Sequence, residues 1–338
     1  MDESRQASNA ASRKRLGLWA VLLFAGLALA FSMVHAQAPL FYSNQNQYLL
    51  HGLAWAGEGL LADDWLAQTT DPTPVFSQLV CWTARLLPLE ALHVWYGLIL
   101  GLYAYCLLQL FRWQSDYLAT WRLSMGFVAL LFLCHAAFIR WLSYRWLGWD
   151  YPYYLLGGLA GQYVLGPVFQ PSVFGVLLLA SLVLFLKERP RLAALVAGLG
   201  VLAHTTYLLS ACFLVAGYLV VLLRERRIAA AIQTAILFAC LIVPVLAYVA
   251  VNFAPTSVED FAEAQRILAH ERIPHHCQPS LWFDAVAGGQ AAWMLVGVAL
   301  SWRTRLFPVL AGCVILGTAL TVAQVLTGSD GLALLFPW

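Results

Sequence analysis

Two adjacent aspartates, Asp63 and Asp64, are the residues of this sequence best placed to do chemistry. They lie in the stretch Leu61-Ala62-Asp63-Asp64-Trp65, in the loop that follows the first hydrophobic run. Carboxylates beside a membrane are costly unless they are solvated, paired or used in function. Either carboxylate could act as a general base that takes a proton from a reacting group. The structural alternative is that Asp64 caps the next turn and Asp63 pairs with a basic residue.

Basic and histidine side chains in other segments are the candidates for binding an anionic substrate. They are His51, Arg145, His204, Arg266, Arg272, His275 and His276. Such groups can stabilise a departing phosphate, and Asp63 or Asp64 could also hold a divalent metal. The alternatives are that the residues from 266 to 276 form a solvated polar loop, that His204 hydrogen-bonds a neighbouring carbonyl, and that Arg145, with Arg140, anchors a span end.

The composition identifies an integral membrane protein. The 338 residues are 62% hydrophobic and 11% charged, whereas a soluble domain carries about 25% charged residues. The net charge of +2 gives no reason to expect nucleic acid as a partner. No nucleotide-binding loop is visible in the sequence. The expected partners are therefore the lipid bilayer and a substrate held in or beside it.

Nine apolar runs predict an all-α bundle of about nine membrane spans. They cover residues 17–34, 91–111, 123–139, 172–186, 192–203, 207–223, 228–251, 285–302 and 306–326. The runs 192–203 and 207–223 are short, so we expect a hairpin of half-depth helices with His204-Thr205-Thr206 at its tip. Non-helical backbone at that depth must be buried in protein or line a cavity.

The basic residues predict the orientation of the bundle. With the N-terminus in the cytoplasm, 14 of the 19 basic residues are cytoplasmic and 12 of the 17 acidic residues are outside, as the positive-inside rule requires. The cytoplasmic basic residues are Arg5, Arg13, Lys14, Arg15, Arg112, Arg122, Lys187, Arg189, Arg191, Arg224, Arg226, Arg227, Arg303 and Arg305. We expect a cytoplasmic segment at 1–15 and a single transmembrane domain at 16–338.

The first apolar run is expected to remain in the mature protein. Arg13-Lys14-Arg15 precedes it and Ala36-Gln37-Ala38 follows it, which also fits a cleaved secretory signal. The run is long enough to span a bilayer, which favours a retained first helix.

The seven cysteines show no metal-binding spacing. Five lie in apolar runs and are predicted to be small buried hydrophobes: Cys106, Cys134, Cys212, Cys240 and Cys313. Cys81 and Cys277 both fall on the outer side, and a disulfide between them is left open.

The first outer loop, residues 35–90, is predicted to contain two juxtamembrane helices. Its apolar residues at helical spacing are Leu49, Leu53, Ala56 and Leu60. They predict an amphipathic helix on the membrane surface, with Asp63 and Asp64 at its end. Thr73 as N-cap and Pro74 at the first position predict a second helix that stops before Pro88.

The other two outer loops differ in character. The second, residues 140–171, is aromatic, and its rings are expected to anchor the interface or to stack on a sugar: Trp141, Tyr144, Trp146, Trp149, Tyr151, Tyr153, Tyr154 and Tyr163. The third, residues 252–284, is the most polar. A helix is predicted over 257–271, with Ser257 as its cap, and Pro274 breaks it.

A first span followed by two juxtamembrane helices and an acidic pair resembles the GT-C superfamily of membrane glycosyltransferases. The matching segments are Ala62-Asp63-Asp64-Trp65, Phe169-Gln170-Pro171-Ser172-Val173-Phe174-Gly175 and Arg272-Ile273-Pro274-His275-His276, which also look like a bacterial polytopic group. The resemblance covers residues 16–280 in organisation. Superfamily members usually have more spans and often a soluble C-terminal domain, so the chain is expected to be a truncated or degenerate copy.

The resemblance implies an activity. The donor would be a polyprenyl-phosphate-linked sugar, and transfer would occur at the outer face of a bacterial inner membrane. Asp63 or Asp64 would be the catalytic base or help to bind metal, and the stretch from Arg266 to His276 would contact the lipid phosphate. The alternatives are a transporter or flippase of a lipid-linked or small polar substrate, and a non-catalytic scaffold that keeps the fold. Oligomeric state is left open.

Overall fold

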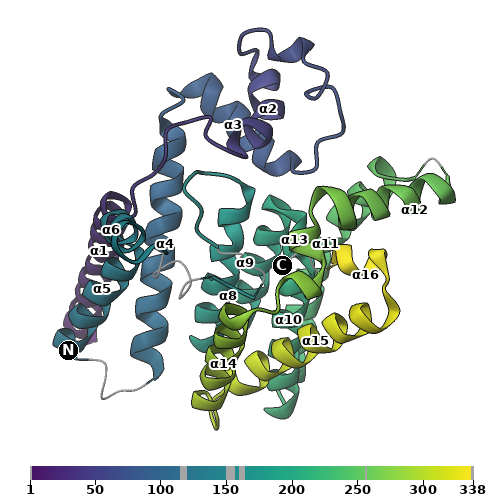
Figure 1. The fold of residues 1–338 in the computed structure, drawn as a ribbon. Helices are drawn as coiled ribbons and strands as arrows, with labels where there is room; N and C mark the ends of the chain where they lie inside the picture. Colours follow the sequence, from purple (N-terminus) through teal and green to yellow (C-terminus); the bar gives the residue numbers. More distant parts are fainter. Residues whose placement is uncertain (1, 115–119, 150–156, 160–163, 256, 336–338) are drawn as a thin grey trace.

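Every regular element in the described part of the chain is a helix (Figure 1). The structure, a computed structural model, describes residues 2–114, 120–149, 157–159, 164–255 and 257–335. The helices are α1 (Asp2–His35), α2 (Gln45–Ala56), α3 (Pro74–Leu86), α4 (Ala91–Gln114), α5 (Trp121–His135), α6 (Ala137–Leu147), α8 (Val176–Leu186), α9 (Pro190–Ala203), α10 (Leu208–Arg224), α11 (Ile228–Asn252), α12 (Val258–Ile267), α13 (Pro274–Cys277), α14 (Ala285–Leu300), α15 (Leu306–Thr327) and α16 (Asp330–Leu335). Short 3-10 or π turns are η1 (Leu61–Asp63), η3 (Pro171–Gly175), η4 (Thr205–Tyr207), η5 (Leu268–Arg272) and η6 (Pro279–Leu281). The predicted all-α fold is confirmed.

Five helices in the described residues are long and apolar enough to cross a membrane. They are Leu18–His35, Ala91–Trp113, Thr205–Arg224, Ile228–Asn252 and Leu306–Thr327. A sixth span results if α5 and α6, which are bent by 54° at Ala136, are counted as one. Three further apolar helices are shorter: Pro171–Leu186, Pro190–Ala203 and Ala285–Leu300. All nine predicted runs are thus helical, and the chain has the helices of a multi-pass membrane protein, although nine full crossings remain a prediction.

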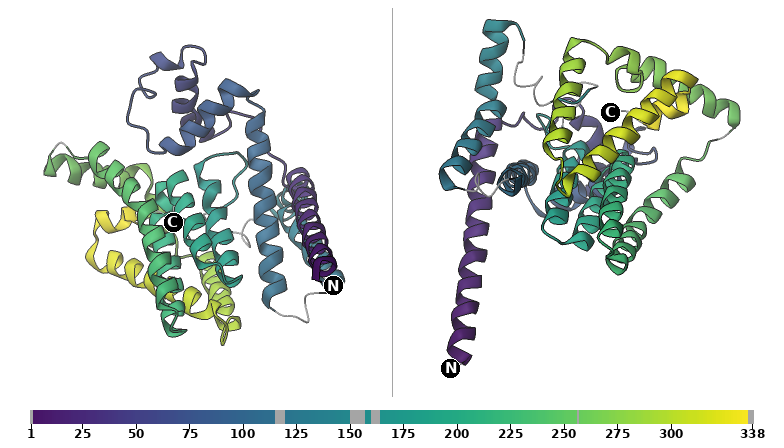
Figure 2. Two further views of the ribbon diagram at one scale, coloured as in Figure 1. Left: turned by 180° about the vertical axis from the view of Figure 1, so that it is seen from behind. Right: turned by 90° about the horizontal axis from the view of Figure 1, so that it is seen from below.

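The N-terminal core joins the first span to α4, α5 and the first outer loop. Phe31, Tyr96 and Leu100 are fully buried at its centre. α1 approaches α4 closely at Gly101, where a Cβ atom would lie 2.4 Å from the Cβ of Ala28. Figure 2 shows this region from behind and from below, with the N-terminal end of α1 projecting from the bundle. Phe31 of the first span belongs to this core, and retention of the span in the mature protein stays a prediction.

A second core lies between α8, α9, α10 and α11 and the start of α15. Ala197, Tyr218 and Leu222 are fully buried in it. The Ser181 hydroxyl donates to the carbonyl of Ala193 at 2.8 Å, and the Tyr218 hydroxyl lies 3.1 Å from the Ser181 hydroxyl. These contacts hold α8, α9 and α10 together. At the end of the bundle where α8 and α10 end, Arg227 and Arg305 pair with two carboxylates, Glu188 and Glu225.

The hairpin predicted over 192–223 is present, but its second limb is longer than expected. α9 has 14 residues, a rise of about 21 Å. Thr205–Arg224 has 20 residues, enough to cross a hydrocarbon core of about 30 Å. His204 lies at the tip, as predicted, between α9 and η4. The expectation of two half-depth helices is therefore wrong for the second limb, because η4 extends α10 by almost a turn.

The first outer loop folds into a helical cap over one end of the bundle (Figure 1). α2 ends at Gly57, which adopts a left-handed φ of 85°. Its apolar residues Leu49 and Leu53 are buried in the N-terminal core instead of lying on the membrane surface. Gly52 makes this packing possible, since a Cβ there would lie 2.5 Å from the Ser77 carbonyl oxygen of α3. α3 begins at Pro74 and ends before Pro88, as predicted.

Candidate functional site

A polar cavity of about 200 Å³ lies between the first outer loop and the outer end of α11. Its lining residues are Gln47, Tyr48, His51, Leu66, Thr69, Thr70, Asp71, Pro72, Thr73 and Phe253. All except Phe253 belong to the first outer loop. The hydroxyl of Tyr248 on α11 donates to the carbonyl oxygen of Asp71 at 2.7 Å. This bond joins α11 to the lining.

Asp71 is the buried acid of this cavity, with only 6% of its surface exposed. Its Oδ1 accepts a hydrogen bond from the backbone N–H of Thr73 at 2.8 Å and is 3.4 Å from the Thr73 hydroxyl. Its Oδ2 is buried and has no hydrogen-bond partner among the described residues. Buried polar atoms are normally satisfied, so an unpartnered carboxylate oxygen beside a cavity is a candidate functional group.

The local sequence explains why Asp71 is held in this way. Prolines on both sides of Thr73 restrict the backbone at the start of α3, and Pro74 occupies the first turn of that helix. Thr73 itself makes no side-chain cap of α3. Asp71 instead supports the backbone of Thr73 before the helix begins. Thr73 is thus the N-cap residue of α3, as predicted, but its side chain makes no capping hydrogen bond.

His51 is the predicted site residue that lines the cavity. Its Nε2 donates to the Thr69 carbonyl oxygen at 3.1 Å, so it connects α2 to the segment before Asp71. Only 7% of its surface is exposed. A second anchor on α2 is Gln45, whose amide donates to the Phe169 carbonyl at 3.0 Å. α2 is thus fixed at two points by side-chain hydrogen bonds.

His204 lies behind the cavity wall and does not line it. Its ring is in edge contact with Tyr48, at 6.1 Å between centroids, and with Tyr207, at 5.7 Å. Tyr48 is a lining residue, so the tip of the α9–α10 hairpin supports the cavity through this ring. The Tyr207 hydroxyl donates to the carbonyl of Ser172. His204 therefore supports the position of the lining residue Tyr48. Direct contact of His204 with a substrate stays a prediction.

Asp63 and Asp64 are both exposed and do not line the cavity. Asp64 Oδ1 accepts from the backbone N–H of Leu66 at 2.8 Å, so it caps the next turn, as the structural alternative predicted. Neither acid makes an ion pair within the described residues, so the pairing of Asp63 with a basic residue is absent there. Asp63 ends the turn η1 and Asp64 follows it, rather than both lying at the end of a long helix, because α2 stops at Gly57.

The predicted cations of the third outer loop lie on an exposed segment. Ser257 caps α12 by accepting from the N–H of Asp260 at 3.0 Å, as predicted. Arg266 pairs with Glu263 at 2.8 Å and with Glu271 at 2.9 Å. α12 has no buried residue and projects from the side of the bundle (Figures 1 and 2). Arg266 is therefore neutralised by its own segment.

Arg272 and His275 are exposed, and His276 is half-buried. The rings of His275 and His276 lie 4.1 Å apart. Burial, and then the neighbouring His275, lower the pKa of His276. None of the three lines the cavity that contains Asp71. Arg145 is exposed on α6 and does not line it either, while Tyr151, Tyr153, Tyr154 and Tyr163 of the second loop lie outside the described residues.

Neither a metal cluster nor a disulfide is found in the part of the chain that the structure describes. No three His, Cys, Asp or Glu side chains there lie close enough to hold a metal ion. Cys81 is buried in α3 with a free thiol, and Cys277 is a free thiol packed against Ala269 and Ala333. Cys81 and Cys277 are therefore two separate buried thiols in the structure and do not form a disulfide with each other.

The structure brings together fewer of the predicted residues than expected, and it adds Asp71. Sequence reasoning missed Asp71 because the adjacent pair Asp63-Asp64 drew attention first. The available signal was an acid in the segment Thr70-Asp71-Pro72-Thr73-Pro74, where two prolines fix the backbone around it. No family model, no curated protein and no solved structure matches this chain.

Proposed function

We propose that this protein is a membrane glycosyltransferase of the GT-C type, which moves a sugar from a polyprenyl-phosphate donor to an acceptor at the extracytoplasmic face. The observation that carries the proposal is the folded first outer loop, whose cavity is lined by the buried acid Asp71 and by His51. In an inverting transfer, a base removes the acceptor's proton as its oxygen attacks the anomeric carbon, and the lipid phosphate departs.

The proposal assigns the base to an acid of the first outer loop. Asp71 is the candidate inside the cavity, and Asp63 and Asp64 are the candidates in the exposed turn before it. The cavity volume of about 200 Å³ is below the range of about 300–1,000 Å³ for drug-sized ligands. It therefore suits one sugar residue, with His51 as a hydrogen-bonding partner and the polyprenyl chain left in the bilayer.

The departing phosphate needs positive partners, and the proposal takes them from the third outer loop. Arg272 and His275 are exposed and make no ion pair within the described residues. Arg266 is already held by Glu263 and Glu271, so it is the weaker candidate. The proposed topology has nine crossings with the N-terminus in the cytoplasm of a bacterium, which puts the cavity and these cations on the same, outer side.

Sugar transfer in isolated membranes tests the proposal. Membranes containing the full chain would be incubated with radiolabelled polyprenyl-phosphate hexoses and pentoses, and loss of label from the lipid would be measured. We expect Asp71→Asn to reduce transfer about 100-fold or more, the usual cost of losing a general base. The double variant Asp63→Ala plus Asp64→Ala tests the exposed pair in the same assay.

The matched control is Glu259→Gln, which removes an exposed acid in the first turn of α12 and should leave transfer unchanged. If transfer survives both Asp71→Asn and the double variant, none of these three aspartates is the base. If wild-type membranes transfer no sugar from any of the donors, the proposed activity itself is wrong.

A non-catalytic scaffold is the second candidate. The observation that favours it is that the cavity is lined only by the first outer loop and Phe253, without the cations of the third loop. A scaffold predicts that a strain carrying the combined Asp63→Ala, Asp64→Ala and Asp71→Asn variant grows and assembles its envelope like the wild type. A glycosyltransferase predicts that this strain behaves like a deletion.

A further inference from the structure

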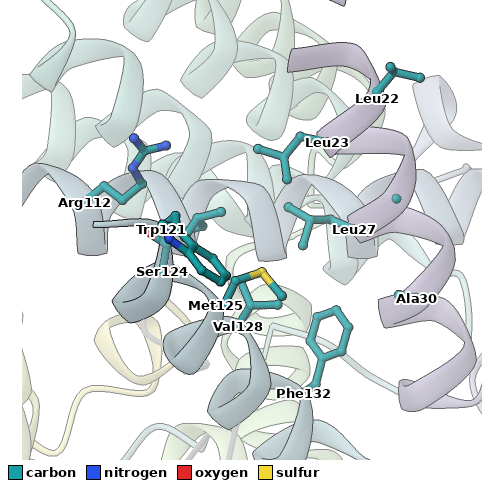
Figure 3. Close-up of a pocket in the computed structure, with 12 residues that line it drawn as sticks. Leu22, Leu23, Leu27, Ala30, Arg112, Trp121, Ser124, Met125, Val128 and Phe132 are labelled. Carbon is teal, nitrogen blue, oxygen red and sulfur yellow. The ribbon is translucent and has the colours of Figure 1, made fainter. Parts of the chain in front are cut away.

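A second, larger cavity lies between α1, α4 and α5, far along the chain from the acids of the outer loops. Its volume is about 590 Å³, within the range of about 300–1,000 Å³ for small-ligand sites. Leu23 and Leu27 of α1 face Met125, Val128 and Phe132 of α5 across it (Figure 3). It is an apolar groove, and Trp121, one of its walls, is 72% exposed.

Among the described residues that line the groove, Arg112, near the end of α4, is the one with a charged side chain. In Figure 3, Arg112 and Trp121 lie toward one end of the groove, while Ala30 and Phe132 lie toward the other. In membrane proteins, arginine and tryptophan side chains are common at the depth of the lipid headgroups. The groove therefore combines an apolar body with a positive, interfacial end.

The length of the groove restricts what can occupy it. Its lining on α5 runs from Trp121 to Phe132, at most about 17 Å along the helix axis. The hydrocarbon core of a bilayer is about 30 Å thick. An occupant that starts at Arg112 therefore reaches through one leaflet only, as an acyl chain of a phospholipid does.

The charge at this end is reinforced by its neighbours and is not cancelled. Lys187 follows α8, and its Nζ lies 5.7 Å from the ring centroid of Tyr105 on α4. Burial, opposed by Cys106 and reinforced by the charges of Arg189 and Arg112, lowers the pKa of Lys187. No carboxylate within the described residues pairs with Arg112. By contrast, Arg227 and Arg305 on the same side of the bundle are paired with Glu188 and Glu225.

We propose that this groove binds an anionic phospholipid, with one acyl chain between α1 and α5 and the headgroup phosphate at Arg112. The hydroxyl of Ser124 on α5, which also lines the groove, is a second polar group near the end that carries Arg112. Each basic residue near an anionic headgroup strengthens binding by about fivefold. The site is separate from the cavity of Asp71 and does not depend on the proposed sugar transfer.

Native mass spectrometry of the full-length protein in detergent tests the site. The probes are palmitoyl-oleoyl phosphatidylglycerol and the matched phosphatidylcholine, titrated separately. We expect the first phosphatidylglycerol to bind at least about fivefold more tightly than phosphatidylcholine. Arg112→Gln should remove this preference. Arg224→Gln, which removes an exposed cation at the end of α10, should preserve it.

A pair of glycine variants tests the groove itself. Gly26 lines the groove, and a Cβ atom there would meet no protein atom within 4 Å, so Gly26→Leu can add side-chain volume at the groove. Gly126 on α5 is equally open but does not line the groove, so Gly126→Leu is the control. We expect Gly26→Leu alone to lower phosphatidylglycerol binding, at unchanged melting temperature.

Three results would overturn the proposal. The first is equal binding of the two lipids by the wild type. The second is an equal loss in Arg112→Gln and Arg224→Gln, which would indicate a general charge effect. The third is a Gly26→Leu variant that is folded and still binds phosphatidylglycerol like the wild type.

Discussion

The first and third outer loops carry similar kinds of residues, yet α2 and α3 of the first loop pack into the N-terminal core whereas α12 of the third loop stays exposed. α2 and α3 place Leu49, Leu53 and Phe76 in the N-terminal core. α12 of the third loop leaves Val258 and Phe261 exposed, at 85% and 47%. The difference shows that a polar outer segment becomes a structured site only where apolar side chains bury it against the spans.

The charged residues of the two loops differ in the same way, in burial and in what holds them. Asp71 is buried and held by the backbone of Thr73, whereas Arg266 is exposed and held by Glu263 and Glu271 of its own segment. Exposed ion pairs contribute little to stability. A buried acid, in contrast, is costly unless the fold supports it or function uses it. The first loop is therefore the better candidate for function.

The largest contrast is expected from two phenylalanine truncations. Phe76 is 1% exposed and its ring lies 5.3 Å from that of Phe169, so Phe76→Ala should cost about 3–5 kcal/mol of unfolding free energy. Phe261→Ala on α12 removes a ring that is 47% exposed and should change little. Denaturant unfolding of the purified protein measures both. Equal losses would mean that the third loop is as well packed as the first.

Adding a side chain at Gly52 should have the next largest effect. A Cβ there would lie 2.5 Å from the Ser77 carbonyl oxygen and 2.6 Å from the Val80 Cβ, so Gly52→Leu must separate α2 from α3, at about 1–3 kcal/mol or more. Reaction of the buried Cys81 thiol with a maleimide, located by mass spectrometry, should become faster. Gly288→Leu, at an open position, is the control. Unchanged protection of Cys81 would contradict the close crossing.

Removal of the two first-loop turn acids should have smaller, unequal effects. Asp71→Ala leaves the buried N–H of Thr73 without its acceptor, at about 1–3 kcal/mol. Asp71→Asn keeps a carbonyl oxygen at that place and should be nearly as stable as the wild type. Asp64→Ala removes a cap from an exposed turn and should cost less than Asp71→Ala. Melting temperatures of the three variants measure these differences. A larger loss of stability in Asp64→Ala than in Asp71→Ala would mean that the exposed Asp64, and not the buried Asp71, is the acid that stabilises the loop.

The smallest effect is expected from pH in the third loop. The pKa of His276 is lowered by burial and by His275, so the folded state prefers the neutral ring. Below the ordinary pKa of about 6.5 the unfolded segment binds a proton that the folded segment resists, and stability falls as pH falls toward the lowered pKa. Hydrogen-exchange protection factors of residues 268–282, which correct for the intrinsic pH dependence of exchange, should be lower at pH 5.5 than at pH 7.5, and His276→Gln should remove the difference.

Much of the helical layout follows from local sequence signals. The hydrophobic runs, the proline at the start of α3 and the Ser257 cap of α12 are local features, and each lies where the sequence predicts. The end of α2 is also local, but the prediction extended it to Leu60 because apolar spacing outweighed Gly57 and Gly59. The left-handed φ of 85° at Gly57 ends the helix earlier, which changes where Asp63 and Asp64 lie.

The sequence by itself determined an all-helical chain with several apolar helices long enough to cross a membrane, because hydrophobicity and helix boundaries depend on neighbouring residues. Only the tertiary structure decided that Asp71 is buried, that Asp63 and Asp64 are exposed, and that Arg266 is neutralised by Glu263 and Glu271. Burial and pairing depend on which segments meet in space. The bond from Tyr248 to Asp71, 177 positions apart, is one such meeting that no local pattern in the sequence specifies.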